Sequence, residues 1–257
     1  MQYPVWHGLK WIEIAGFQIP TYSLLFTTAV LFGSFSIYFF AKKEGAPTNK
    51  IASLLTFTVL SGLIFSRLVH VFFYDWSYFQ NHLIEIPQIW KGGLASHGGT
   101  IGFIVGVVLY TRFWGNLWYW WVFDRMAIGI PIGGAIIRLG NFANSELYGK
   151  LSDCSYCIIF ANAGVLPRYP IQLMEAGAYF TLGLIFFILY FSNWKTKQFG
   201  FYTGALLIGM SSLRIILENF KASEIVYFGM NTGQLLSIPF LVLGLIVIFA
   251  AHKKYLN

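Results

Sequence analysis

Charge is scarce in this sequence. Only 11% of its 257 residues are Asp, Glu, Lys or Arg, and just 10 are acidic. Soluble domains carry about 25% charged residues. More than half of the sequence, 57%, is hydrophobic, and these residues fall into long blocks. The composition therefore excludes a soluble domain and predicts an integral membrane protein of the helical type.

Familiar catalytic and metal-binding motifs are also missing. The sequence contains no Gly-x-Ser-x-Gly elbow, no phosphate-binding P-loop and no zincin motif. Its two cysteines, Cys154 and Cys157, have no matching pair of metal ligands nearby. We expect either a small disulfide or two unreactive thiols, and neither a metal nor a cofactor.

Seven apolar blocks are long enough, at about 20 residues each, to cross a hydrocarbon core of about 30 Å. They predict an all-α integral membrane protein with seven transmembrane helices in a single polytopic domain of residues 1–257. The expected spans are residues 19–41, 50–73, 95–114, 117–137, 172–192, 199–217 and 233–251.

Basic residues gather in the short connections on one side of these spans. The connections hold one acid, Glu44, and eight basic residues: Lys42, Lys43, Lys50, Arg112, Lys195, Lys197, Lys253 and Lys254. The positive-inside rule makes this side cytoplasmic, with the N-terminus outside and the C-terminus inside. The net charge of +7 therefore reflects topology, with anionic membrane lipids as partners and no nucleic acid.

The first 18 residues lack the basic-then-apolar layout of a cleavable signal peptide. Their apolar side chains predict a short segment in the outer interface. These side chains are Trp6, Trp11, Ile12, Ile14 and Phe17. We expect the first span to act as an uncleaved signal.

The most informative stretch runs from Arg138 to Gly149, directly after an apolar block, and includes Asn141, Asn144 and Glu146. Hydrocarbon penalises such groups unless they are paired or hydrated. The guanidinium of Arg138 suits phosphate oxygens, and Asn141 shares its helical face. A capped helix end with an arginine reaching the interface is the alternative. Taken together, the residues favour a site.

A second candidate lies at residues 92–99, at the start of the third span. Glycines such as Gly98 and Gly99 let a ligand approach the backbone and leave N–H groups for an anion. A histidine, here His97, suits proton transfer near neutral pH. A lone histidine at an interface is often structural, but the glycine frame favours a functional role.

Two further clusters flank the fifth and sixth spans. Arg168, Gln172 and Glu175 recur at near-helical spacing and form either a packing network or a wall of the site. Arg214 and Glu218 end the sixth span at a spacing that permits an ion pair. If it faces a shared cavity, Arg214 adds a second charge for the same anion.

Other polar residues lie inside the spans. Arg67 and His70, one turn apart on the second span, either line the cavity or join helices, and we favour lining. Asp124 and Arg125 are expected to find partners on neighbouring helices. Arginines, a histidine and amides at the outer boundary fit an enzyme that acts on an anionic lipid headgroup.

The stretch Arg138–Gly149 resembles the signature of the bacterial prolipoprotein diacylglyceryl transferases, roughly small-Arg-x-Gly-Asn-Phe-apolar-Asn-x-Glu-x-x-Gly. Other pieces of that family's pattern are similar too: the Tyr22 region, residues 92–99, residues 168–172, Arg214 with Glu218, and residues 233–239. The likeness runs in order over about residues 16–250.

The resemblance implies a multi-pass enzyme of the bacterial cytoplasmic (inner) membrane with its active site toward the outer, periplasmic side. Such enzymes move the diacylglyceryl group of phosphatidylglycerol to the lipobox cysteine of a preprolipoprotein. A thioether forms and glycerol phosphate is released, as the first step of lipoprotein maturation. The nucleophile arrives with the substrate, so no catalytic cysteine or serine is expected in the chain.

The same resemblance implies roles for individual residues. Arg138 and Arg214 would hold the lipid phosphate, while His97 and Tyr22 would serve catalysis, with His97 as the base for the thiol. The residues expected to shape the phosphatidylglycerol site are Asn141, Asn144, Glu146, Gly98, Gly99 and Gly149. The supporting residues are Arg168, Gln172, Glu175, Glu218, Arg67 and His70.

Some positions depart from the family's pattern. Met210 stands where many members carry tyrosine, and Tyr169 where a histidine is frequent. We expect the hydroxyl of Ser211 or Tyr202 to replace the one missing at Met210. The rival interpretations are a catalytically silent homologue that binds lipid or lipoprotein precursors, and a membrane transporter.

Overall fold

The computed structural model describes residues 3–14, 16–115, 117–194, 198–222, 225–227 and 229–255. Lys195 and Lys197, two of the basic residues behind the predicted topology, lie outside this set, as do the side chains of Lys253 and Lys254. The chain divides into two compact units, residues 1–36 with 123–257, and residues 37–122. Each unit is described by itself.

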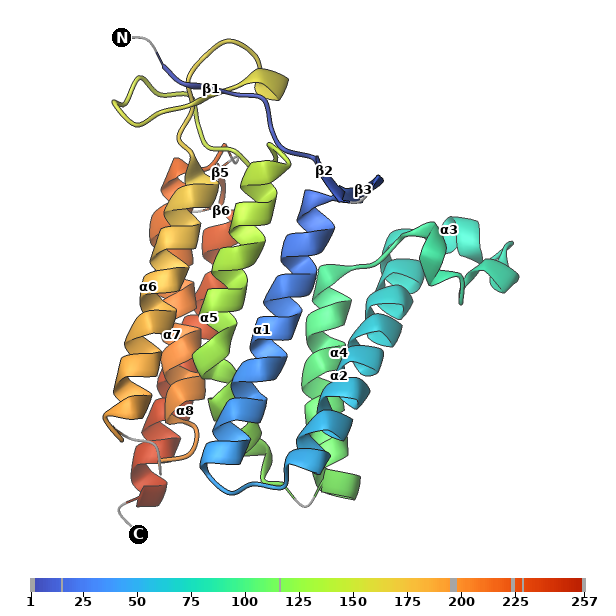
Figure 1. The fold of residues 1–257 in the computed structure, drawn as a ribbon, viewed down its shortest axis with the longest axis vertical. Coiled ribbons are helices and arrows are strands. Elements are labelled where there is room, and N and C mark those ends of the chain that lie inside the picture. Colours follow the sequence, from blue (N-terminus) through green and yellow to red (C-terminus); the bar gives the residue numbers. More distant parts are fainter. Residues whose placement is uncertain are drawn as a thin grey trace. The chain divides into compact units, whose positions relative to one another are not determined.

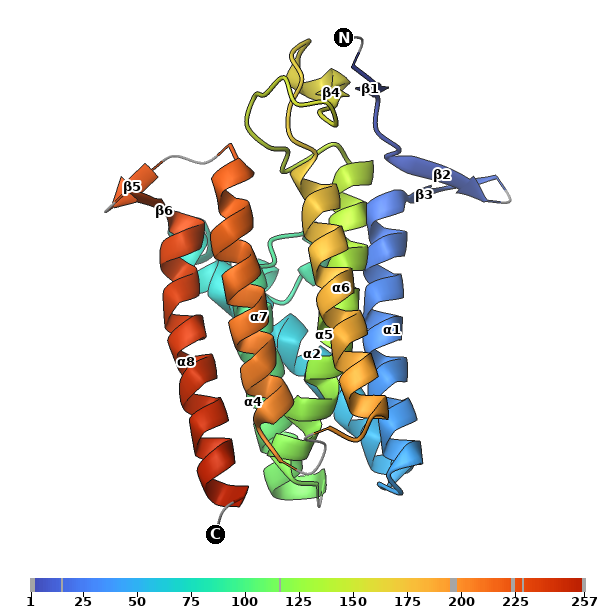
Figure 2. The same ribbon diagram turned by 90° about the vertical axis from the view of Figure 1, so that its left-hand side faces the viewer.

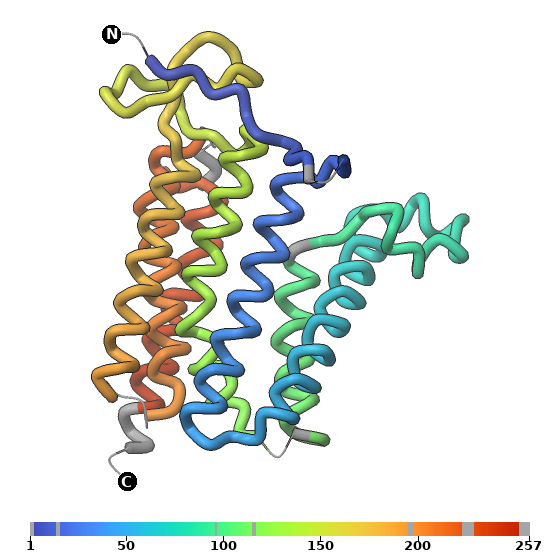
Figure 3. The backbone as a smooth tube through the Cα atoms, viewed as in Figure 1, coloured from blue at the N-terminus to red at the C-terminus, as the bar shows by residue number. Residues whose placement is uncertain are grey.

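The first unit is a helical bundle (Figures 1 and 3). Its helices are most of α1 (Thr21–Lys43), α5 (Tyr119–Ala143), α6 (Ile171–Phe191), α7 (Phe201–Leu217) and α8 (Thr232–Tyr255). A 3-10 turn at Glu218–Phe220 follows α7, and a short hairpin of β5 (Ile225–Tyr227) and β6 (Met230–Asn231) leads into α8. The end of α5, the start of α6, the end of α7 and the start of α8 therefore lie at one end of the bundle.

Small residues let the helices of this unit approach closely. Gly204 of α7 and Gly244 of α8 face each other, and a Cβ on either would lie 2.9 Å from the carbonyl oxygen of the other. Gly133 of α5 faces Ala29 of α1, where a Cβ would make an ordinary contact at 3.6 Å from the Ala29 carbonyl oxygen. Such contacts are typical of helices that pack within a membrane.

At the opposite end of the bundle, Asp124 of α5 caps the start of α7. Its carboxylate accepts hydrogen bonds from the backbone N–H groups of Gly200 (2.7 Å) and Thr203 (2.9 Å) and from the Thr203 hydroxyl (2.6 Å). Because the first N–H groups of a helix lack partners within it, the buried carboxylate is satisfied where it also meets the positive helix end. Arg125 lies over the Tyr190 ring. The structural role expected for both residues is confirmed.

The N-terminal segment forms strands above α1 and α5 (Figure 2). β1 (Val5–Trp6) pairs in parallel with β4 (Ile159–Phe160) of the α5–α6 connection, and β2 (Trp11–Ile14) forms a hairpin with β3 (Phe17–Pro20). Trp6 stacks on Phe142 at 4.6 Å and donates to its carbonyl, so it belongs to the core of the unit. The hairpin instead exposes Trp11 and Phe17.

The second unit is built around a tight pair of helices, α2 (Thr48–Val69) and α4 (Ser96–Tyr110). Gly98, Gly102 and Gly106 form a stripe on α4 at every fourth residue, and a Cβ on Gly102 would lie 2.5 Å from the carbonyl oxygen of Ser61. The Ser61 hydroxyl donates to the Gly102 carbonyl at 2.8 Å. A π-helical turn (His70–Tyr74), α3 (Trp76–Phe79) and two 3-10 turns (Leu83–Glu85 and Ile89–Lys91) connect the pair.

Six helices in the described ranges are long and apolar enough to cross a membrane. They are Thr21–Lys43, Thr48–Tyr74, Tyr119–Ala143, Ile171–Phe191, Phe201–Phe220 and Thr232–Ala251. The expected third span is the α-helix α4, whose 15 residues extend about 22 Å, followed by a π-helical turn at Thr111–Gly115. That length is short of the hydrocarbon thickness, so the seventh crossing stays a prediction.

The predicted boundaries agree to within a few residues except at α5. This helix continues to Ala143, six residues beyond the predicted end at 137. Arg138, Gly140 and Asn141 are therefore helical and project from the last turns of α5. Gly140 packs closely on Tyr22 of α1, because a Cβ there would lie 3.1 Å from the tyrosine ring.

We expect Gly102→Ala to destabilise the protein. Its added Cβ would force α2 and α4 apart, and overpacking of this kind costs about 1–3 kcal/mol. The midpoint of thermal unfolding in detergent should fall. Gly177→Ala in α6 is the matched control because nothing lies within 4 Å of its Cβ position. Equal midpoints for the two variants would contradict a requirement for close approach of α2 and α4.

Candidate functional site

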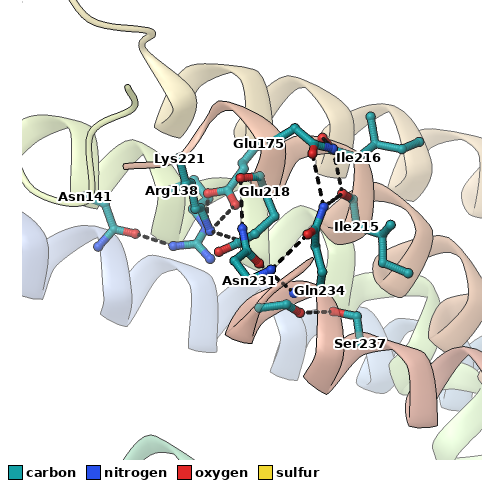
Figure 4. Close-up of polar contacts among 12 residues, drawn as sticks. Arg138, Asn141, Glu175, Ile215, Ile216, Glu218, Lys221, Asn231, Gln234 and Ser237 are labelled. Atoms are coloured by element: carbon teal, nitrogen blue, oxygen red, sulfur yellow. Dashed lines mark hydrogen bonds and ion pairs between the residues drawn. The ribbon is translucent and has the colours of Figure 1, made fainter. Parts of the chain in front are cut away.

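A polar network joins the helix ends at one end of the first unit (Figure 4). Arg138 on α5 donates from Nε to Oε2 of Glu175 on α6, at 2.8 Å. It also donates from Nη1 to Oδ1 of Asn141, at 3.1 Å, which confirms that these two residues share a helical face. The Glu175 side chain is buried, whereas that of Arg138 keeps 21% of its surface exposed. The Nη groups thus retain N–H donors at a partly open position.

Asn141 links Arg138 to the turn that follows α5. Its Nδ2 donates to Oε1 of Glu146 at 2.7 Å, and Gln172 of α6 donates to the Glu146 carbonyl at 2.7 Å. Gln172 is fully buried, and Ser145 and Leu147 on either side of Glu146 have positive φ angles of 53° and 57°. Non-glycine residues adopt this backbone only when surrounding contacts enforce it, so the turn is built to present Glu146.

Lys221 completes the network and was not anticipated from the sequence. Its Nζ lies 2.9 Å from Oε1 of Glu175 and 3.2 Å from Oε2 of Glu218. Glu175 therefore holds a cation on each carboxylate oxygen. The only local signal was the i,i+3 spacing from Glu218 to Lys221, which is common to many solvated helix ends.

A second layer fixes the backbone around Glu218. Asn231 donates to the Glu218 carbonyl at 3.3 Å, and Gln234 of α8 donates to the Ile215 carbonyl at 3.1 Å. Asn231 and Gln234 also exchange two backbone–side-chain hydrogen bonds. Gly233 lies directly against the Glu218 carboxylate, so a larger residue there would displace it.

Arg214 lies on the last turn of α7 and is exposed. In the described part of the chain it forms no hydrogen bond or ion pair, because Glu218 pairs with Lys221 instead. The spacing that permits an Arg214–Glu218 pair thus does not produce one. Tyr179 of α6 is buried next to this region of the first unit, and the charges of both Arg138 and Arg214 act on its hydroxyl.

Tyr179 also lies next to Met210, the position where many family members carry a tyrosine hydroxyl. It packs in a small core with Ala135 and Ala176, and Met210 covers this core. The Tyr202 hydroxyl instead donates to the Trp194 carbonyl at the opposite end of the bundle, so the expectation that it replaces the missing hydroxyl was wrong. A tyrosine from a neighbouring helix cannot be found from spacing within α7.

Arg168 lies in the connection between α5 and α6 and supports its backbone. It donates to the Gly149 carbonyl at 3.3 Å and stacks over the Tyr148 ring. Gly149 is wedged against Tyr169 and Phe220, where a Cβ would lie 2.7 Å from either carbonyl oxygen. Its backbone forms a bridge with Lys221. Arg168 and Gly149 therefore place the segment that carries Lys221.

The same connection contains the disulfide Cys154–Cys157, which settles the choice left open between a disulfide and free thiols.

Tyr22, at the start of α1, packs on Gly140 and stacks with Phe26. The Asn144 side chain makes no hydrogen bond within the described ranges, although its backbone N–H donates to the Gly140 carbonyl.

The second unit holds the other predicted residues. Arg67 donates to four carbonyls of the loop before α4: those of Glu85, Ile86, Gly92 and Gly93, at 2.7–3.1 Å. Its side chain is buried. Arg67 therefore organises this loop instead of presenting free donors, in contrast to the lining role that we favoured.

His70 and His97 line one pocket of about 320 Å³, together with Tyr74, Leu94 and Ala95. The His70 Nε2 lies 3.1 Å from Oδ2 of Asp75, while His97 is exposed and makes no hydrogen bond in the described residues. Gly98 and Gly99 face α2.

The loop before α4 carries an ion pair at 3.2 Å between the half-buried Glu85 and the exposed Lys91. The hydrogen bond from Lys91 holds the pKa of the Glu85 carboxyl below its ordinary value. In the part of the chain that the structure describes, no group of three or more His, Cys, Asp or Glu residues is placed to hold a metal ion.

Comparison with known proteins gives consistent matches over most of the chain. A family model described as prolipoprotein diacylglyceryl transferase matches residues 10–250. A phosphatidylglycerol–prolipoprotein diacylglyceryl transferase from Tolumonas auensis is 36% identical over 246 residues, which cover 95% of each chain. One from Chloroherpeton thalassium is 37% identical over 242 residues, or 92% of this chain and 89% of the relative. One from Brucella ovis is 40% identical over 196 residues, or 73% and 68%.

Glu175→Gln should strongly destabilise the fold. It leaves Arg138 and Lys221 without their shared counter-charge and places an amide donor against one of them. Breaking a buried ion pair in this way costs about 3 kcal/mol, measured by unfolding in detergent. Glu85→Gln, which removes the carboxylate partner of the exposed Lys91, is the matched control and should leave the unfolding midpoint unchanged. A similar small effect of both variants would contradict a structural role for the network.

Proposed function

This chain belongs to the prolipoprotein diacylglyceryl transferase family, and from that premise we propose that it transfers the diacylglyceryl group of phosphatidylglycerol to a preprolipoprotein. The acceptor is the thiol of a lipobox cysteine, and the leaving group is glycerol phosphate. The observation that carries the proposal is Arg138, whose guanidinium is fixed by Glu175 and Asn141 yet keeps N–H donors on its Nη groups.

The site in the first unit suits the lipid phosphate. Arg138 is oriented through Nε and one Nη1 hydrogen, and its remaining donors can meet phosphate oxygens in a charge-assisted geometry. Arg214 is exposed on the last turn of α7, and its charge acts on the Tyr179 hydroxyl, as does that of Arg138. In our proposal the two guanidinium groups bind the phosphate from two helices, while Asn141, Asn144, Glu146 and Gly149 shape the site.

The substrate supplies the nucleophile, so the protein has to stabilise the charge that develops on the leaving phosphate. The thiolate sulfur attacks the glyceryl carbon that carries the phosphate ester, a C–S bond forms, and the C–O bond to phosphate breaks. Negative charge then builds on the departing phosphate oxygen. Arginine donors already directed at that oxygen stabilise this charge more in the transition state than in the bound lipid.

We assign the thiol proton to His97. Thiols are nucleophilic as thiolates, and an ordinary cysteine has a pKa of about 8.5, so a base raises the reactive fraction near neutral pH. His97 is exposed toward a pocket that it shares with His70, and Asp75 is placed to orient His70. Tyr22 beside Gly140 completes the set of residues proposed for catalysis, with Arg67, Arg168, Gln172, Glu175 and Glu218 in support.

The membrane arrangement is part of the same proposal. Seven crossings with the N-terminus outside place the Arg138 network on the outer side of the cytoplasmic membrane, where a lipobox cysteine emerges after translocation. The members of this network come from helix ends that lie at one end of the first unit, which favours a site at a membrane face. A transporter would instead place such charges near the middle of its spans.

Purified protein in detergent with phosphatidylglycerol and a lipobox peptide should release glycerol phosphate. Release should require the peptide cysteine and should fail with serine in its place. Arg138→Gln should lower kcat/KM by about 100-fold or more, as expected when a transition-state donor is lost. The control is Arg112→Gln, at the exposed π-helical turn after α4. Folded wild-type protein that binds phosphatidylglycerol without release would leave the silent lipid-binding homologue as the better interpretation.

His97→Gln should change the pH dependence of transfer as well as its rate. We expect a loss of about 100-fold near pH 7, within the usual range for a general base. The residual rate should rise about tenfold per pH unit toward the pKa of the peptide thiol, about 8.5. His82→Gln, which changes an exposed histidine of the same unit, is the control. A uniform loss at all pH values would exclude His97 as the base.

A further inference from the structure

Lys221 lies at the centre of the polar network, although it contacts no residue of the proposed catalytic set directly. Its ammonium lies between two buried carboxylates, 2.9 Å from Glu175 and 3.2 Å from Glu218. Its own side chain is only 17% exposed. A lysine in this setting is poorly placed to bind a lipid itself, and its effect must pass through the two glutamates.

Glu175 transmits that effect to Arg138. One carboxylate oxygen binds Lys221 and the other binds Nε of Arg138. The carboxylate is therefore held at both ends, and it holds the guanidinium through the nitrogen that leaves the Nη groups available. Without Lys221, Glu175 could turn both oxygens to Arg138 in the bidentate arrangement that arginine favours with carboxylates. That arrangement would take one of the three donors left for phosphate and would turn the guanidinium toward Glu175.

The charge balance of the network also depends on Lys221. Two cations, Arg138 and Lys221, face two carboxylates, Glu175 and Glu218. Loss of the lysine leaves a net negative cluster at a mostly buried position, where charges are weakly screened. An anionic lipid would then be repelled by the residues around its intended arginine.

The backbone holds Lys221 firmly in this place. Lys221 forms an antiparallel bridge with Gly149, and the Lys150 N–H donates to the Phe220 carbonyl at 2.9 Å. The Lys221 N–H donates to the Glu218 carbonyl at 3.2 Å. The signature stretch after α5 and the segment after α7 are thereby joined at this lysine.

We propose that Lys221 is a positioning residue for lipid phosphate: it occupies Glu175 and neutralises Glu218 so that Arg138 stays free to bind the anion. This inference rests on the proposed transfer from phosphatidylglycerol. It assigns Lys221 an effect on lipid affinity, exerted through Arg138, rather than a part in the bond-making step.

The test is a steady-state comparison in mixed micelles, with phosphatidylglycerol varied as its surface mole fraction. Lys221→Met should raise KM for the lipid at least about tenfold while kcat changes less than about threefold, the pattern of lost ground-state binding. Lys221→Arg should keep KM within about threefold of wild type because it preserves the charge. Lys150→Met, an exposed lysine on the adjoining segment, is the matched control and should behave as wild type.

A double variant separates charge from folding. Lys221→Met with Glu218→Gln removes one cation and one carboxylate, so it restores the balance and should recover most of the lost affinity. It also carries the test if the single variant unfolds. A wild-type KM in Lys221→Met, or equal KM values in the single and double variants, would overturn the proposal. Absence of transfer by the wild-type protein would instead refute the proposed function itself.

Discussion

The structure depends on the pairing of the buried Glu175 carboxylate with two cations from different segments. A single charge at this depth would be costly, because the surroundings neither hydrate nor screen it. Arg138 from α5 and Lys221 from the segment after α7 remove that cost only if three helix ends meet at one place. The ion pairs therefore define the geometry of this end of the bundle, apart from the anion-binding role that we propose for it.

Polar groups at the helix ends find their partners differently at the two ends of the first unit. At one end Asp124 satisfies the start of α7 and leaves no donor for a ligand. At the other, the last turns of α5 and α7 carry Arg138 and Arg214, and some of their donors are left available. About 14 residues of α5 separate Asp124 from Arg138, or roughly 20 Å at the α-helical rise. One helix thus carries a structural anchor and a candidate binding group at its two ends.

Much of this could be predicted from the sequence, because hydrocarbon imposes simple rules on length and charge. The apolar blocks gave the helices to within a few residues, and the Arg138–Asn141 contact followed from helical spacing. Lys221 and Tyr179 could not be found, since their partners come from segments distant in the sequence. The sequence also could not show that Arg67 has no free donors. In the sequence it resembles an arginine of a binding site, yet carbonyls of the loop accept its hydrogen bonds. Whether an arginine is free is decided by the backbone around it.

The carboxylates of the network have a further consequence for a site that releases a phosphate monoester. Unopposed cations at such a site would bind the product, which carries up to two negative charges, more tightly than the singly charged lipid. Glu146, Glu175 and Glu218 offset this long-range attraction. In the function that we propose, recognition then depends on the short-range, directional donors of the arginines, which discriminate by geometry and not by total charge. A balanced cluster can therefore stabilise developing charge at one oxygen and still allow the product to leave.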